Sequence, residues 1–222
     1  MNPYIDPDTG AFYNKLGIKD PDELHQVEYA VTDLRIAELL VKPIPGKFDL
    51  EHLKAVHTHI FQDLYEWAGQ VRTLDFSKRD PADPNWKSPF APAASINDVA
   101  DVITSELQHA GYLKGMKQAE FTAELAATYV KLNYMHPFNE GNGRSTQTFL
   151  TLLARDAGYE LNYGNVSKDE WNQAAARSMP QTHVRDPGFK RRPDVAPIHE
   201  AFAKIVEPQR TRVREPDRDL ER

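Results

Sequence analysis

The chain has 222 residues, of which 40% are hydrophobic, and this is enough for one medium-sized domain with a buried core. Its formal net charge of −6 gives no general attraction to nucleic acid or an anionic membrane, so we expect a protein or small-molecule partner. The absence of cysteine excludes disulfide scaffolds, thiolate zinc sites and cysteine nucleophiles. No stretch approaches the roughly eighteen apolar residues of a membrane span, which predicts a cytoplasmic protein, although a translocated effector would have the same composition.

Prolines and a glycine in residues 1–20 predict an extended N-terminal arm. A helix is predicted from Pro21, with Asp20 as its N-cap. A second helix is predicted over 49–66, where a Trp-Ala-Gly run at 67–69 is expected to stop it.

Residues 71–90 differ from these helices, because VRTLDF alternates like a strand and KSPF can return as its partner across a proline-containing turn. We expect a hairpin flap there that aligns an extended target segment by strand addition. Apolar residues three and four apart then predict helices over 95–110, 117–134, 141–157 and 167–179. The predicted fold class is therefore all-α, a helical core with one small β-hairpin flap.

The end of the chain differs in composition, because ten Lys/Arg and eight Asp/Glu fall from residue 183 onward, among several prolines. A short helix and a frayed tail are expected in this part. The predicted organisation is an arm over 1–20, a domain over 21–182, and an extension over 183–222 with a helix over 196–206 and a tail from 209.

The stretch MHPFNEGNGR, residues 135–144, carries the strongest functional signal and lies between two predicted helices. A glycine-containing turn that leads into a helix leaves backbone N–H groups pointing at one spot, where the helix dipole also favours negative charge. Arg144 can add a bidentate contact to a phosphate oxygen. These features predict a site for a diphosphate or triphosphate.

Neighbouring side chains suggest the chemistry of this site. Glu140 lies beside the predicted anion site, and a single carboxylate next to a polyphosphate commonly holds Mg²⁺. His136 can take a proton from an incoming hydroxyl near neutral pH. His57 and His59 are two apart and so point to different sides of a helix, and we interpret them as partner-bonded or solvated rather than as metal ligands.

At these residues the sequence resembles the Fic family, whose core motif is HPFx[D/E]GNGRxxR. Eight positions match without a gap, which is a highly specific signal. They are His136, Pro137, Phe138, Glu140, Gly141, Asn142, Gly143 and Arg144. The resemblance implies a helical core with a β flap and a nucleotidyltransferase that moves AMP from ATP onto a Tyr, Ser or Thr hydroxyl of another protein.

The resemblance also implies roles for the motif residues. His136 corresponds to the general base and Arg144 to a catalytic phosphate contact. Glu140 corresponds to the ligand of a Mg²⁺ or Mn²⁺ ion that bridges the α- and β-phosphates, and attack on the α-phosphate releases pyrophosphate. The implied nucleotide-binding residues are Gly141, Asn142, Gly143, Arg144 and Gln147.

One position departs from the family pattern, because the second motif arginine is replaced by Gln147. In the family that arginine meets the terminal phosphate of ATP, whereas Gln147 brings no charge. Transfer from another phosphate-containing donor therefore stays open. A degenerate Fic fold that binds nucleotide or a partner without chemistry also stays open, although the intact His136 argues against it.

The segments PYIDPDTGAFYNKLGIKD and YEWAGQVRT resemble the short bacterial Fic toxins and related type IV secretion effectors. In that branch a small separate antitoxin supplies an inhibitory helix with the motif [S/T]xxxE[G/N]. Only Glu140 is followed by Gly or Asn in this chain, which implies an inhibitor in trans or none. In the toxin branch the targets are type II topoisomerases modified on a tyrosine, and we expect no direct nucleic-acid or membrane partner.

Overall fold

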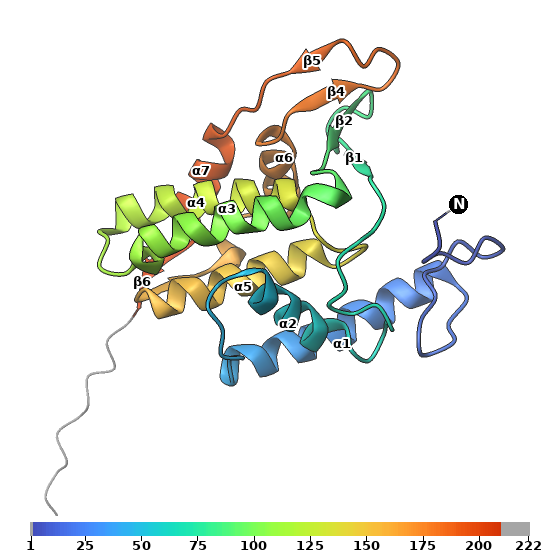
Figure 1. Cartoon of the computed structure of the whole chain (residues 1–222), viewed down its shortest axis with the longest axis horizontal. Helices are drawn as coiled ribbons and strands as arrows, with labels where there is room; N and C mark the ends of the chain where they lie inside the picture. Colours follow the sequence, from blue (N-terminus) through green and yellow to red (C-terminus); the bar gives the residue numbers. More distant parts are fainter. Residues whose placement is uncertain (1, 210–222) are drawn as a thin grey trace, which may run out of the picture.

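Helices dominate residues 2–209, the part of the chain that the computed structural model describes (Figure 1). The helices are α1 (Pro21–Val41), α2 (Leu50–Phe61), α3 (Ile96–His109), α4 (Gln118–Met135), α5 (Asn142–Asp156), α6 (Lys168–Arg177) and α7 (Ala196–Ile205). The strands are β1 (Ser77–Arg79), β2 (Trp86–Pro89), β3 (Tyr159–Leu161), β4 (Gln181–His183), β5 (Lys190–Arg191) and β6 (Val206–Pro208). Apart from Gln209, the predicted tail lies outside the described residues. No helix within 2–209 combines the length and apolar character that a membrane crossing requires.

The first helix begins after its predicted N-cap, Asp20, and the second begins at Leu50, one residue after its predicted start. The Asp20 carboxylate accepts from the first N–H groups of α1, and the Asp49 carboxylate accepts from the first turn of α2. The predicted end of the second helix at 67–69 is wrong, because α2 stops at Phe61. The N–H groups of Leu64 and Tyr65 both bond to the Phe61 carbonyl, so the chain turns there while its apolar side chains stay in the core.

The core lies where α2, α3, α4, α5 and α7 pack against one another. The side chains of Phe121, Leu125, Phe149 and Phe202 are completely buried there. Each such side chain contributes about 1.5–3 kcal/mol through burial. These contacts fix the two helices, α4 and α5, that flank the HPFx[D/E]GNGR motif.

The predicted hairpin is part of a larger sheet, a four-stranded antiparallel sheet in the order β1-β2-β4-β5 (Figure 1). Its first strand is Ser77–Arg79 rather than VRTLDF, so that part of the prediction is wrong. The reason is that the Arg72 side chain points inward and is buried, so residues 71–76 do not pair with a neighbouring strand. β2 pairs with β4, so the predicted boundary between 182 and 183 falls inside a strand.

Residues beyond 183 also join the helical core. The predicted short helix is confirmed as α7, which packs against α4 and α6 through buried Ile198, Phe202 and Ile205. After α7, β6 pairs antiparallel with β3. The C-terminal part of the described chain therefore belongs to the same packed unit as the motif.

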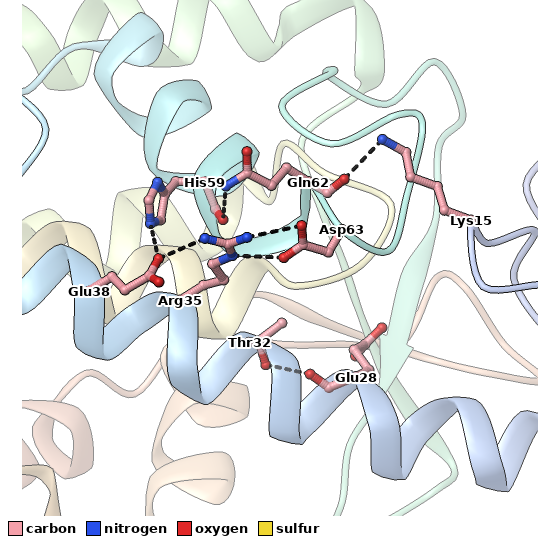
Figure 2. Close-up of polar contacts among 8 residues, drawn as sticks. All are labelled: Lys15, Glu28, Thr32, Arg35, Glu38, His59, Gln62 and Asp63. Carbon is pink, nitrogen blue, oxygen red and sulfur yellow. Dashed lines mark hydrogen bonds and ion pairs between the residues drawn. The ribbon is translucent and has the colours of Figure 1, made fainter.

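A polar network ties α1 to the end of α2 (Figure 2). The Arg35 guanidinium donates to both Asp63 oxygens at 2.7 and 3.0 Å and to Glu38 at 2.9 Å. His59 pairs with the same Glu38 carboxylate at 3.1 Å, which confirms it as partner-bonded. Hydrogen bonding to Arg35 lowers the pKa of Asp63. The network fixes the position of α1, and with it the neighbouring Glu28.

Candidate active site

His136 terminates α4 in a left-handed conformation, with φ 42° and ψ 62°. Its ring stacks on Phe90 with 3.6 Å between centroids and meets the edge of Phe76 at 5.8 Å. Burial, and next the positive charges of Lys78 and Arg72, lower the pKa of His136 to about 3. The imidazole is therefore neutral at physiological pH and can accept a proton.

Arg72 holds the backbone at His136, a role that its place in an alternating stretch did not predict. Its side chain is 1% exposed and donates to the carbonyls of His136 at 2.7 Å, Ala91 at 2.6 Å, Leu74 at 2.7 Å and Met135 at 3.3 Å. Charged donors make stronger hydrogen bonds than neutral ones. Arg72 therefore joins the segment before the flap to the end of α4.

His57 supports the motif loop, residues 136–141 between α4 and α5, and this confirms it as partner-bonded. The Gly69 N–H donates to its Nδ1 at 2.8 Å, so Nε2 carries the hydrogen and donates to the Glu140 carbonyl at 3.1 Å. Its ring stacks between Phe138 at 3.8 Å and Phe61 at 4.5 Å. Burial is the main reason that the pKa of His57 falls to about 4.

Gly141 and Asn142 shape the turn into α5. Gly141 has φ +78°, and a Cβ there would lie 2.1 Å from the Phe61 ring, so only glycine fits. The Asn142 amide donates to the Phe138 carbonyl at 2.7 Å and accepts from the Phe138 N–H at 2.9 Å. The Asn142 side chain is thus committed to bracing the loop, and its backbone N–H remains for a ligand.

The first N–H groups of α5 face an opening. No side chain caps this helix, and a Cβ on Gly143 would meet nothing within 4 Å. Gly143 also lines two adjoining cavities, which share Lys78, Gln147, Trp171 and Asn172 as well. An uncapped helix N-terminus that opens on a cavity is suited to an anion.

We name the two cavities after the motif residue that each contains. The His136 cavity lies between the flap, α4, α5 and α6, and the Arg144 cavity lies between the flap, α1, α5 and α6. Further residues of the His136 cavity are Arg79, Pro81, Ser88, Phe90, Tyr129, Asn133, Asn142, Thr146, Ala175, Ala176 and Met179. Further residues of the Arg144 cavity are Tyr29, Glu140, Gly141, Tyr163, Val166, Ser167 and Lys168.

Arg144 is paired with a residue that sequence reasoning missed. Its guanidinium donates to the buried Glu28 carboxylate and, at 3.0 Å, to the Thr32 hydroxyl, while Glu140 lies at 3.5 Å. The Tyr65 hydroxyl donates to the same Glu28 carboxylate. A detectable signal existed, because Glu28 and Thr32 follow a buried leucine of α1 at intervals of four.

Glu140 is the one carboxylate among the residues that line the two cavities. Its Oε1 accepts from the Gly141 N–H at 2.9 Å, and the side chain is 44% exposed. Residues 2–209 contain no group of three or more carboxylate, histidine or cysteine side chains that could hold a metal by themselves. The donor set fits an ion such as Mg²⁺, which binds through one or two carboxylates, phosphate oxygens and water.

Gln147 lines both cavities from the second turn of α5. The structure thus brings His136, Glu140, the Gly141–Gly143 turn, Arg144 and Gln147 together around connected cavities. Sequence reasoning missed Arg72, Glu28 and the cavity-lining residues of α6.

The fold and this site define a helical domain with an anion-accepting glycine turn next to a neutral histidine. The chain belongs to the Fic/DOC family, whose model matches residues 47–154.

Similar proteins include the protein adenylyltransferase VbhT of Bartonella schoenbuchensis, 41% identical over 177 residues that cover 80% of this chain and 36% of VbhT. The chain thus spans about a third of that relative. The probable protein adenylyltransferase Fic of Escherichia coli is 34% identical over 78% of this chain and 82% of its own. Among solved structures, the effector BepC of Bartonella tribocorum with bound AMPPNP has a TM-score of 0.80 and 26% identity, covering 93% of this chain and 97% of BepC.

Proposed function

We propose that the protein transfers AMP from ATP to a hydroxyl side chain of a target protein. The observation that carries the proposal is that the neutral His136 ring and the uncapped start of α5 open on the same cavity. A base for a hydroxyl and a site for phosphates are thereby adjacent. The names of the relatives agree with this class of enzyme.

In this proposal the N–H groups at Asn142, Gly143 and Arg144 bind phosphate oxygens. Glu140 would hold Mg²⁺, which supplies charge neutralisation at the phosphates. The apolar side of the His136 cavity, formed by residues such as Tyr129 and Met179, suits a nucleoside. The AMPPNP and ADP bound in related effector structures support an adenine nucleotide as the ligand.

The proposed transfer is a nucleophilic substitution at phosphorus. The target hydroxyl oxygen forms a bond to the α-phosphorus, and the bond from that phosphorus to the bridging oxygen of the β-phosphate breaks. Pyrophosphate leaves, and the hydroxyl proton passes to the His136 imidazole. The Arg72 contact to the His136 carbonyl keeps the base in place during this transfer.

A bound triphosphate also changes the pKa of the base, His136. Its negative charge lies beside a ring whose pKa is lowered by burial and by the positive charges of Lys78 and Arg72. Added anionic charge favours the imidazolium form, so ATP binding raises the pKa of His136 from its low value toward the range of an effective base.

The proposal is tested by His136→Ala in the full chain. Transfer is expected to fall by about 10²–10⁴, because a general base contributes that much, while ATP affinity changes little. Intact mass of candidate targets measures the transfer and calorimetry measures the binding. His109→Ala, at an exposed position at the end of α3 that lines neither cavity, serves as the control. Wild-type transfer by His136→Ala would refute the assignment.

Gln147 supports a second candidate, transfer from a different phosphate-containing donor. The side chain at this position lines both cavities but carries no charge for a terminal phosphate. Incubating one target with several nucleotides distinguishes the donors, because each leaves a different added mass.

The partners follow the resemblance to the toxin and effector branch. We propose a type II topoisomerase as the target, modified on tyrosine, and a small antitoxin that supplies an inhibitory helix in trans. We place the activity in the cytoplasm, either of the producing cell or of a cell that receives the protein. The second location is supported by the related solved structures, which are VirB-translocated Bartonella effectors.

A further inference from the structure

The Arg144 cavity contains more positive charge than the motif alone provides. Lys78 enters it from the flap and Lys168 from the first residue of α6. Gln147 lines the same cavity, at the position where the family carries a second arginine. Cations from two other elements, the flap and α6, therefore line the same cavity as this glutamine.

Lys168 and Arg144 contact the same aromatic ring, that of Tyr29. The Lys168 Nζ lies 5.6 Å from the centroid of the Tyr29 ring, and the Arg144 guanidinium carbon lies 4.8 Å from the same centroid. Ser167 caps α6 by accepting from the Glu170 N–H at 3.2 Å, which fixes the start of that helix. Two cations thus share one aromatic ring at the edge of the phosphate site.

The two cations differ in what neutralises them. Arg144 is paired with the buried Glu28 carboxylate. Within residues 2–209, Lys168 has no ion pair and no side-chain hydrogen bond, and it is exposed. An exposed ammonium that lines an anion-accepting cavity together with a second positive charge is suited to a multiply charged ligand.

We infer that Lys168 binds the terminal phosphate of ATP and supplies the charge that Gln147 lacks. The inference rests on the proposed function, because it takes ATP as the donor. It assigns the innermost phosphates to the start of α5 and the outermost phosphate to the start of α6. The lysine contributes binding and orientation, and the chemistry stays at the α-phosphate beside His136.

The test is the affinity of the full chain for ATP, ADP and AMP, measured by calorimetry with Mg²⁺. Lys168→Ala is expected to weaken ATP by about three- to tenfold, the effect of one partly exposed charge, and to leave ADP within about twofold. Lys117→Ala removes an exposed charge next to the start of another helix, α4, and is expected to change neither affinity. Adding Gln147→Arg to Lys168→Ala is expected to restore the preference for ATP over ADP.

Unchanged ATP affinity in Lys168→Ala would overturn the inference alone. The same holds if Lys78→Ala removes the preference for ATP while Lys168→Ala keeps it, because the flap would then supply the charge. A wild-type chain that binds no ATP would overturn the proposed function together with the inference. The two failures are thus distinguished by the wild-type measurement.

Discussion

The motif loop and the flap border the same His136 cavity but are held in different ways. The loop is fixed by buried side chains, because His57 bonds to the Glu140 carbonyl and Arg72 bonds to the His136 carbonyl. In β1, all three residues are exposed and one edge of the strand is unpaired in the four-stranded sheet. The fixed side is suited to precise chemistry, and the open edge is suited to receive an extended segment of varied sequence.

The flap is nevertheless anchored at its base by the C-terminal strands. The Gln181 amide of β4 donates to the Asp80 carboxylate at 2.6 Å, and both residues are buried. The guanidinium of Arg191 in β5 lies 3.8 Å from the centroid of the Trp86 ring. The sheet thus holds β1 in position while its outer edge stays accessible.

The largest effect is expected from substituting alanine at Gly141 and Gly143, the two glycines of the turn into α5. Gly141→Ala combines a positive φ with a clash at 2.1 Å from Phe61, so it is expected to destabilise the fold by about 3 kcal/mol or more. Gly143→Ala meets no atom within 4 Å, so we expect a stable protein whose added methyl group occupies the phosphate site.

Thermal unfolding and ATP calorimetry on both variants check this pair. We expect Gly141→Ala to lower the melting temperature strongly and Gly143→Ala to leave it within a few degrees of wild type. ATP affinity in Gly143→Ala should fall by at least about tenfold. Equal stability of the two variants would contradict the view that the loop is fixed by packing at Gly141.

A smaller and more selective effect is expected from Gln181→Leu. It leaves the buried Asp80 carboxylate without this donor, at a cost of about 1–3 kcal/mol, and loosens the flap from its base. We expect kcat/KM for the target to fall while ATP affinity stays unchanged. Gln173→Ala, exposed on α6, is the control. If ATP affinity falls along with target modification, then the strands support the whole site rather than the flap.

The smallest effect concerns pH and His57. Its folded pKa of about 4 lies below the unfolded value of about 6.5, so only the unfolded chain gains a proton between these values. The stabilising effect of a neutral His57 is therefore present above pH 6.5 and lost as pH falls toward 4. Over this range the free energy of unfolding falls by up to about 1.4 kcal/mol per pH unit.

Urea unfolding at pH 7 and pH 5 measures this dependence. His57→Gln is expected to be less stable than wild type at pH 7, since it loses the stacked ring, but to lose less stability on acidification. His136 has an even lower pKa. Both proteins contain it, so its contribution to the pH dependence of stability is the same in both. A variant with the wild-type pH dependence would show that the unfolded state, or another group, sets the acid sensitivity.

The sequence was informative where structure depends on neighbouring residues. The capping residue Asp20 and apolar spacing predicted the first two helix starts, and the motif predicted the family that the relatives confirm. The sequence was uninformative where partners are distant along the chain. Arg72 bonds to His136, 64 positions away, and no periodicity signals that an arginine in an alternating stretch will be buried. The pairing of β2 with β4 was missed for the same reason.

The ion pair between Glu28 and Arg144 bears on how this catalytic unit could be excised or transplanted. The segment that matches the family model, residues 47–154, contains Arg144 but neither Glu28 and Thr32 of α1 nor Lys168 of α6. A fragment cut to those limits would leave the guanidinium without the carboxylate and hydroxyl that orient it. A module that keeps both this ion pair and the packed core therefore extends from α1 through α7.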